Sequence, residues 1–217
     1  MSMLKNVLGC VAFGLLLAPL AAQAGPLTIV SVNSPAVNCV FNLACAVVVT
    51  NSLGTFVPPG DARMARLQSR TYIGAPGAPA AGLTAYEYRV DLTSATAAHP
   101  NSLNCVKQLI LDIGPVARLP YQRAVTHPGW ISADMFVVTT GGLGTIGLSS
   151  AVQVGDVVTF TFTKPVCPKP LIVTAAIPGE SSFFFGLAAK TAPKPSTAKL
   201  IYSLGGDAMT AARVPIH

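Results

Sequence analysis

The sequence predicts an all-β fold, a two-sheet antiparallel β-sandwich of the immunoglobulin-like or jelly-roll-like kind, on two observations. Its regular segments alternate apolar and polar residues with the period of a β-strand, and they are rich in Val, Thr, Ile, Phe and Tyr. Clusters of glycine and proline separate these segments, and no helical pattern of comparable length accompanies them. Many short strands without helical partners favour two packed sheets.

The alternating pattern places the strands along most of the chain. It predicts strands at residues 27–32, 45–50, 83–93, 105–113, 135–140, 145–153, 157–163, 171–177, 182–188 and 199–204. Two segments between them are interpreted as irregular: residues 114–130 as a long loop, and residues 190–199 as a Lys/Pro/Thr connector. The order of the strands does not follow from the pattern.

The clearest strand is 83–93, because its two faces differ in chemistry. Tyr86 and Tyr88 share one face with other apolar residues, whereas Glu87 and Arg89 lie on the opposite face. We therefore expect the tyrosines to pack in the core and the charges to face outward. A run of three phenylalanines at 183–185 places aromatic rings on both faces of another strand, which favours a central position in a sheet over a partner-binding edge.

The first residues of the chain predict a signal peptide at 1–24 and a single mature domain at 25–217. Lys5 precedes an apolar run at 7–20 that is too short to span a bilayer, and Ala22-Gln23-Ala24 has the small-x-small pattern of a cleavage site. We expect cleavage before Gly25. No later apolar run is long enough for a transmembrane anchor in the mature chain, so the expected location is secreted or periplasmic.

The mature part keeps four cysteines, Cys39, Cys45, Cys105 and Cys167, and an even number in an exported protein favours two disulfides. We expect Cys39 to pair with Cys45, because six residues suit a hairpin or tight loop. We expect Cys105 to pair with Cys167, because one opens a strand pattern and the other closes one, and such positions meet at one end of antiparallel neighbours. Closely spaced C-x2-C pairs are lacking, so the cysteines do not indicate zinc.

The composition narrows the class of partner. Charged residues make up 10% of the chain and hydrophobic residues 51%, and the formal net charge is +6 at pH 7. This basic balance suits an anionic envelope polymer or glycan, but it is too diffuse to indicate a nucleic acid. A low content of charged residues is typical of a protein with a large buried core, and it also allows self-association through a weakly charged surface.

The concentrated positive charge of the chain is a set of three arginines, Arg63, Arg66 and Arg70. A short helix capped by Asp61 would put all three on one face, whereas a strand would put Arg66 and Arg70 beside Gln68. Either arrangement gives a basic stripe. The stripe either prevents an edge strand from pairing with another chain or binds the anionic groups of glycans or lipids.

A second candidate region is 114–134, because long loops often carry function. Its candidate binding residues are Arg118, Tyr121, Arg123 and Trp130. His127 and Asp134 are the weak candidates for a general base and its acid partner, although His-Pro-Gly-Trp is more often a turn. The chain has no G-x-S-x-G or H-E-x-x-H motif and no D-x-D-x-D calcium loop, so we expect no catalytic machinery, no metal and no cofactor.

Two short stretches carry a resemblance to other proteins. Residues 86–92, Tyr-Glu-Tyr-Arg-Val-Asp-Leu, and residues 181–187, Ser-Ser-Phe-Phe-Phe-Gly-Leu, resemble segments of uncharacterised exported bacterial β-rich proteins. The resemblance implies secretion and a bacterial source, and it implies no activity.

These observations lead to one expected function and two alternatives. The expectation is a structural or binding module of the bacterial envelope or extracellular space that acts by surface contacts and is not an enzyme. One alternative is a secreted hydrolase, with carbohydrates as one candidate substrate class and its site in 114–134. A pocket joining His127 to a carboxylate would favour it. The other is a subunit of a homopolymeric surface assembly, which the low charge suggests.

Overall fold

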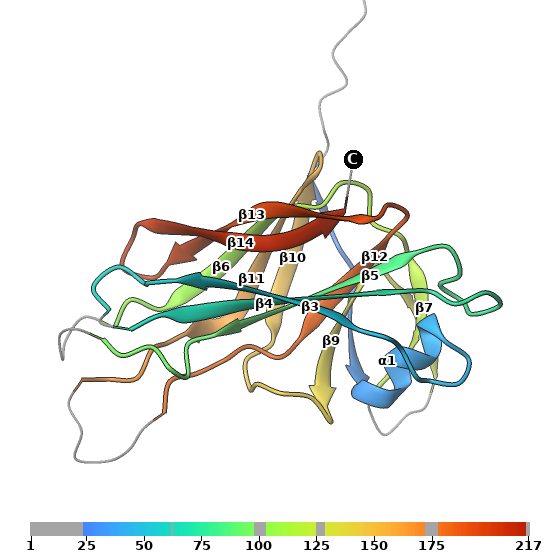
Figure 1. The fold of residues 1–217 in the computed structure, drawn as a ribbon, viewed down its shortest axis with the longest axis horizontal. Coiled ribbons are helices and arrows are strands. Elements are labelled where there is room, and N and C mark those ends of the chain that lie inside the picture. The colour runs from blue at the N-terminus through green and yellow to red at the C-terminus, as the bar shows by residue number, and fades with distance from the viewer. Residues whose placement is uncertain (1–23, 62, 98–102, 125–128, 172–177, 216–217) are drawn as a thin grey trace, which may run out of the picture.

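The computed structural model describes residues 24–61, 63–97, 103–124, 129–171 and 178–215 (Figure 1). Within them the chain forms one helix, α1, and a series of strands, β1 to β14. Their bounds are β1 Gly25–Pro26, β2 Ile29–Asn33, α1 Ser34–Phe41, β3 Thr50–Phe56, β4 Ala65–Ile73, β5 Thr84–Asp91, β6 Val106–Asp112, β7 Leu119–Gln122, β8 Trp130–Ala133, β9 Met135–Thr140, β10 Leu148–Val154, β11 Val157–Val166, β12 Phe185–Ala189, β13 Pro193–Tyr202 and β14 Asp207–Pro215.

Two large sheets pack face to face and confirm the predicted β-sandwich (Figure 1). Sheet A has the order β1-β10-β11-β6-β13-β14, and sheet B has the order β2-β9-β12-β5-β4-β3. Neighbouring strands run antiparallel in both sheets, except that β2 pairs in parallel with β9. The sheets are therefore antiparallel apart from this edge pair.

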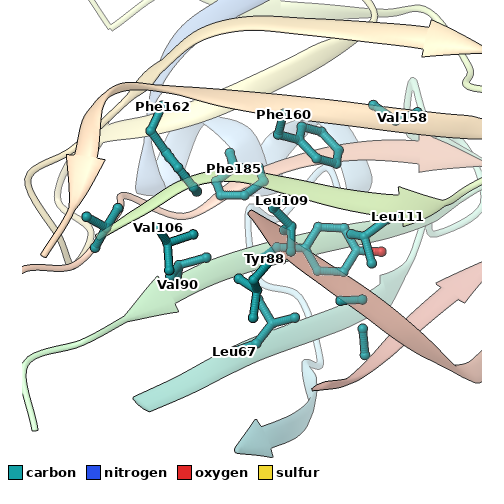
Figure 2. Close-up of a cluster of buried hydrophobic side chains, with 14 of the residues drawn as sticks. Leu67, Tyr88, Val90, Val106, Leu109, Leu111, Val158, Phe160, Phe162 and Phe185 are labelled. Atoms are coloured by element: carbon teal, nitrogen blue, oxygen red, sulfur yellow. The ribbon is translucent and has the colours of Figure 1, made fainter. Parts of the chain in front are cut away.

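The main core lies between the sheets and is built around aromatic rings. Figure 2 shows Phe160 and Phe162 of β11 facing Tyr88 of β5 and Phe185 of β12. The rings of Phe160 and Phe185 have centroids 5.1 Å apart, a spacing at which aromatic pairs attract. Tyr88 is fully buried and donates its hydroxyl proton to the carbonyl of Arg213 at 2.7 Å. The expectation that Tyr86 and Tyr88 belong to the core is confirmed.

A second hydrophobic cluster lies on the outer face of sheet B, away from sheet A. Helix α1, the hairpin of β7 and β8, and residues 74–83 cover this face; α1 and β7 lie beside one another at one end of the molecule (Figure 1). Phe41 of α1 packs edge-on against Tyr72 of β4 with 4.9 Å between ring centroids. The central position of the strand with the phenylalanines is also confirmed, since Phe185 points into the main core and Phe184 into the second cluster.

This covering layer corrects one expectation from the sequence. Glu87 does lie on the face opposite Tyr86 and Tyr88, but it is only 5% exposed rather than solvated. The alternation of a strand reveals which residues share a face, and it does not reveal what packs against that face. A buried carboxyl group is therefore held on the outer side of sheet B.

Three sequence interpretations are wrong in detail. Residues 46–49, predicted as a strand, have no ladder partner, and β3 begins only at Thr50. The predicted loop at 114–130 contains β7, which pairs with β8. The predicted connector at 190–199 is mostly β13. The half of β13 that contains the prolines pairs only with β14, and a strand paired on one side tolerates the missing backbone N–H groups of proline. The strand predicted at 171–177 lies almost entirely outside the described residues.

The sequence patterns also missed α1 and β14 as elements, and they gave β4 only as one of two alternatives. The helix is short and covers only eight residues, so its apolar face consists of Val37, Val40 and Phe41. A proline in the first turn favours its start, whereas Asn33 at the N-cap position makes no side-chain capping hydrogen bond. A helix of eight residues has only about two turns, so it gives little periodic signal in the sequence.

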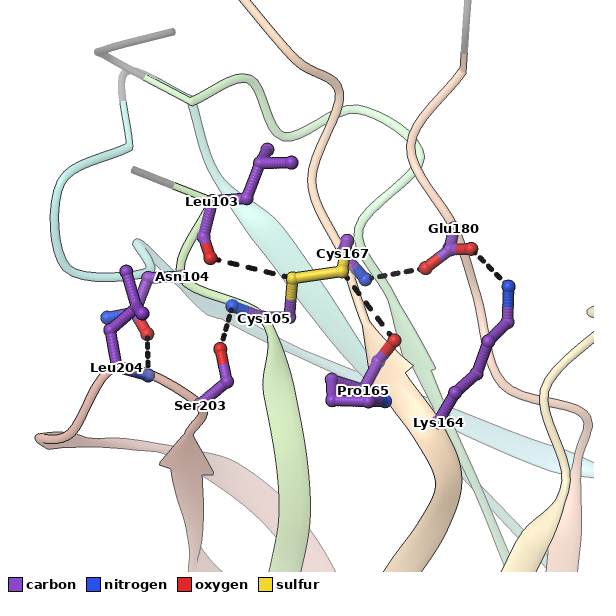
Figure 3. The surroundings of a disulfide bond; sticks show 9 residues. All are labelled: Leu103, Asn104, Cys105, Lys164, Pro165, Cys167, Glu180, Ser203 and Leu204. Atoms are coloured by element: carbon purple, nitrogen blue, oxygen red, sulfur yellow. Dashed lines mark hydrogen bonds and ion pairs between the residues drawn. A yellow bond between two sulfur atoms is a disulfide. The ribbon is translucent and has the colours of Figure 1, made fainter. Parts of the chain in front are cut away.

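Both disulfides pair as the sequence predicts. Cys39 of α1 is bonded to Cys45 in the turn that follows, and Cys105 is bonded to Cys167. The second bond joins the start of β6 to the end of β11, which are antiparallel neighbours with Val106 opposite Val166. Figure 3 shows the polar groups around it: the backbone N–H of Cys167 donates to Glu180, whose carboxylate also pairs with Lys164 at 2.7 Å.

Two disulfides in one chain fit a protein of an oxidising compartment, because the cytosol keeps most thiols reduced. Among the described residues, no helix has the length and hydropathy that crossing a membrane requires.

Candidate functional site

The candidate site is a pocket on the outer face of sheet B, where the covering layer ends. Cross-strand pairing places Asn51 of β3, Arg70 of β4, Glu87 of β5 and Gly186 of β12 side by side in one row. Directly opposed residues on one face of a sheet have their side chains within contact range. The register therefore brings a guanidinium group and a carboxyl group together.

The pocket has a volume of about 350 Å³, within the usual range for small-ligand sites. Helix α1, the unpaired segment 46–49, and the turn that follows β9 form its walls around the floor of sheet B. Apolar walls and a few convergent polar groups are typical of binding sites. Its lining consists of Ser34, Val37, Asn38, Val47, Val49, Arg70, Tyr72, Glu87, Val138, Gly141, Gly142, Leu143 and Phe184.

Glu87 is the buried acid of this pocket. Tyr72 donates its hydroxyl proton to Glu87 Oε1 at 2.8 Å, and no other described residue bonds to Oε2. Burial raises the pKa of the Glu87 carboxyl above its ordinary value, while the Tyr72 hydrogen bond and the charge of Arg70 oppose that rise. Glu87 thus offers one oxygen to a ligand, and its charge depends on the groups beside it.

Arg70 is held in place from two sides. Its guanidinium lies over the ring of Phe184, 3.9 Å from the ring centroid, and its Nε donates to Asn51 Oδ1 at 3.2 Å. A cation over an aromatic face is favourable, and the stack fixes the plane of the guanidinium. The two terminal nitrogens have no partner among the described residues and can donate to a ligand. Arg70 is therefore a preorganised donor beside the acceptor Glu87.

Gly186 leaves room for these side chains. A Cβ atom at this position would lie 2.6 Å from the backbone oxygen of Tyr86, 2.8 Å from the ring of Phe136 and 3.0 Å from Cγ of Glu87. Any larger residue would therefore push Glu87 or Phe136 aside. Glycine at this point of a central strand fits the close packing of the second cluster around the carboxyl group.

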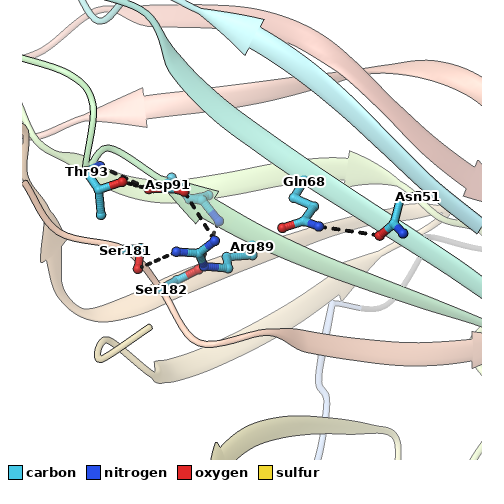
Figure 4. Close-up of polar contacts among 8 residues, drawn as sticks. Asn51, Gln68, Arg89, Asp91, Thr93, Ser181 and Ser182 are labelled. Atoms are coloured by element: carbon cyan, nitrogen blue, oxygen red, sulfur yellow. Dashed lines mark hydrogen bonds and ion pairs between the residues drawn. The ribbon is translucent and has the colours of Figure 1, made fainter. Parts of the chain in front are cut away.

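A polar strip continues from the pocket along the outer face of sheet B, with Arg89 and Asp91 as its largely buried members. It consists of Asn51, Arg66, Gln68, Arg70, Arg89 and Asp91. Figure 4 shows the Arg89 guanidinium between Asp91, its ion-pair partner at 3.2 Å, and Ser181, whose hydroxyl accepts at 3.0 Å. The same view shows Gln68, whose Nε2 donates to Asn51 Oδ1 at 3.4 Å. Arg66 is exposed, and no ion pair links it to a described residue.

The structure decides between the two arrangements considered for the arginine stripe. Arg66, Gln68 and Arg70 lie on the same face of strand β4, as the strand alternative predicts. Arg63 is exposed but precedes β4, so it does not share that face as a helix would require. Two of the three candidate arginines thus belong to the polar strip, and one of them reaches the pocket.

Of the described candidates in 114–134, Asp134 lines an open cavity together with Val116, and the other described candidates do not line that cavity. Tyr121 is fully buried beneath the β7–β8 hairpin, with its ring 5.3 Å from that of Phe136, so it has no surface for a ligand. Trp130 is 59% exposed and Arg123 is exposed. Arg118 donates from Nε to the hydroxyl of Ser132 and from Nη2 to its carbonyl. These contacts tie Arg118 to the hairpin itself.

Asp134 is engaged by neighbouring groups. Its Oδ1 lies 3.5 Å from Nη1 of Arg118, and its Oδ2 accepts the backbone N–H of Thr28 at 2.7 Å. These contacts give Asp134 a structural part in joining β2 to the hairpin. His127 lies outside the described residues, so its distance from Asp134 is not defined.

One pattern of the sequence gains its explanation only from the structure. Residues 142–147, Gly-Leu-Gly-Thr-Ile-Gly, match G-x-G-x-x-G, which in dinucleotide-binding folds joins a strand to a helix. Here the pattern follows β9 and leads into β10, a strand of the opposite sheet. No helix N-terminus is formed, so the glycines serve the turn that lines the pocket.

Glu87 and Phe184 are the site residues that the sequence reasoning missed. The available signal was a carboxylate opposite two tyrosines on a central strand, together with a run of phenylalanines whose rings point to both faces where β12 begins. No group of three or more His, Cys, Asp or Glu side chains suited to a metal ion occurs in the described part of the chain. The chain matches no family model, and no curated protein or solved structure is significantly similar to it.

Proposed function

We propose that this chain is an exported binding module that holds a saccharide unit in the pocket on the outer face of sheet B. The observation that carries the proposal is the cross-strand opposition of Arg70 and the buried Glu87 at the base of a pocket whose walls include several valine side chains. The predicted signal peptide at 1–24 and the two disulfides support export to an extracellular or periplasmic space.

The charges in the pocket favour a neutral, hydroxylated ligand. When Glu87 is ionised, its charge offsets that of Arg70, so neither a cation nor an anion is preferred. A hydroxyl group both donates and accepts, and it can therefore satisfy Arg70 and Glu87 together. The valine side chains of the walls suit the C–H surfaces of a sugar ring.

The pocket favours binding over cleavage. Glu87 is the single carboxyl group among its described lining residues, whereas glycoside hydrolysis ordinarily uses a pair of carboxyl groups. Glu87 is also committed to Tyr72 through Oε1. A residue held in this way orients a ligand and adds specificity.

Arg70→Ala is expected to weaken saccharide binding at least about tenfold, because it removes charge-assisted hydrogen bonds inside a partly enclosed site. The measurement is binding of the oxidised, exported protein to an array of defined oligosaccharides, followed by titration calorimetry of the best ligand. Glu87→Gln, which keeps the shape but removes an acceptor, should also weaken binding.

The matched control is Arg123→Ala, an exposed arginine beside the β7–β8 hairpin. It should leave affinity unchanged. If Arg123→Ala abolished binding while Arg70→Ala did not, the ligand site would belong to the hairpin and the proposal would be wrong.

A further inference from the structure

We infer that the pocket is the terminal subsite of a longer, open binding surface. The polar strip along β4 forms the rest of this surface and binds a saccharide chain that bears anionic groups. This inference rests on the proposed function, because the pocket is assigned one unit of that chain. Arg70 belongs to both the pocket and the strip, so the two are continuous.

The length of the strip requires a chain rather than a single sugar. Arg66 and Arg70 are four residues apart on the same face of β4, which corresponds to about 13 Å at the rise of a β-strand. A ligand that contacts both must extend well beyond the ring held in the pocket. Leu53 of β3 lies opposite Gln68 between them and is 53% exposed, which offers an apolar contact beside an amide.

The net charge of the polar strip predicts the charge of the saccharide chain that it binds. Arg89 is paired with Asp91, and Arg70 stands beside Glu87, so these positive charges are offset. Arg66 is exposed and stands opposite Asp91, which is already ion-paired with Arg89, so the three arginines outnumber the carboxyl groups of Glu87 and Asp91 by one. A carboxylate or phosphate group on the chain is the complementary partner for a guanidinium.

The side chains of the strip are also ordered before binding. Asn51 Oδ1 accepts from both Gln68 Nε2 and Arg70 Nε, which holds the two donors side by side. Groups that are already positioned lose less conformational freedom when a ligand arrives. The strip is therefore better suited to a ligand of defined spacing than a set of independent surface charges would be.

The test measures binding of the oxidised, exported protein to an array of saccharides. Each oligosaccharide that bears uronic acid or phosphate is printed beside its neutral counterpart, and the single sugars are printed as well. Wild type should prefer the longer anionic chains. Arg66→Ala should lower affinity for those chains about fivefold, with affinity for single sugars and neutral chains unchanged. Binding of the anionic chains by wild type should weaken as salt is raised.

Lys107→Ala provides the matched control, because it removes an exposed positive charge from β6 of the other sheet. It should have no effect. If wild type bound single sugars as tightly as long anionic chains, and Arg66→Ala changed neither, the extended surface would be refuted while the pocket proposal stood. If no saccharide bound wild type, both proposals would fail.

Discussion

Replacing both Cys105 and Cys167 by alanine should lower the free energy of unfolding by about 4 kcal/mol. The bond closes a loop with a sequence separation of 62 residues, and the loop-entropy relation gives this size for the constraint on the unfolded chain. The bond also joins β6 to β11, two central strands of sheet A. Denaturant titration followed by tryptophan fluorescence and circular dichroism measures the effect.

The matched control is the double replacement of Cys39 and Cys45, whose separation is only six residues. The same relation gives about 2 kcal/mol for this shorter loop. The prediction is contradicted if the Cys105/Cys167 variant is no less stable than the Cys39/Cys45 variant, since loop length would then not govern the stabilisation.

Phe185→Ala should destabilise the protein by about 4 kcal/mol, the range found when a large buried aromatic side chain is removed. Phe185 is 1% exposed, and its ring lies within 6.2 Å of the ring centroids of three other aromatic residues. Its loss leaves a cavity between the sheets that these rings cannot fill without leaving their packed positions. The three neighbouring aromatic residues are Tyr88, Phe160 and Phe162.

Phe183→Ala is the control for this change, because Phe183 is only half-buried at the margin of the same core. Phe183→Ala should lower the free energy of unfolding by less than half as much as Phe185→Ala. The midpoint of denaturant unfolding should shift in both variants with an unchanged slope. Equal losses from the two substitutions would show that the rings around Phe185 do not form the main core.

Much of the sandwich could be predicted because its signals are local. The alternation in β5 separates Tyr88 from Glu87 correctly, and the positions of Cys105 and Cys167 at strand ends identify β6 and β11 as antiparallel neighbours. The run of three phenylalanines leads into β12, which is central in sheet B, and its rings pack on both faces of that sheet. The alternation and the phenylalanine run each need only a few consecutive residues, and the disulfide needs only that each cysteine marks the end of a strand pattern.

The second layer could not be predicted in the same way. Burial of Glu87 depends on α1, the segment 46–49 and the turn after β9, which come from separate parts of the sequence. The short helix carries little periodicity, and the segment 46–49 has strand composition without a ladder partner. The parallel pairing of β2 with β9 brings α1, which follows β2, close to β9 and the turn after it.

The candidate site was accordingly found in part. The sequence identified Arg70 through its spacing with Arg66, but it gave no reason to associate Arg70 with Glu87. That association follows from the register of β4 and β5, in which the two residues are directly opposed. A register involves residues distant in sequence, so a pattern within one strand does not define it.

The most direct test of the account is a map of amide chemical-shift changes in isotope-labelled protein titrated with the strongest saccharide ligand from the array. We predict that the changes will centre on Arg70, Glu87 and the turn at Gly141 and Gly142, and will extend along β4 toward Arg66. Changes confined to the β7–β8 hairpin around Trp130, or no saccharide ligand at all, would contradict the account.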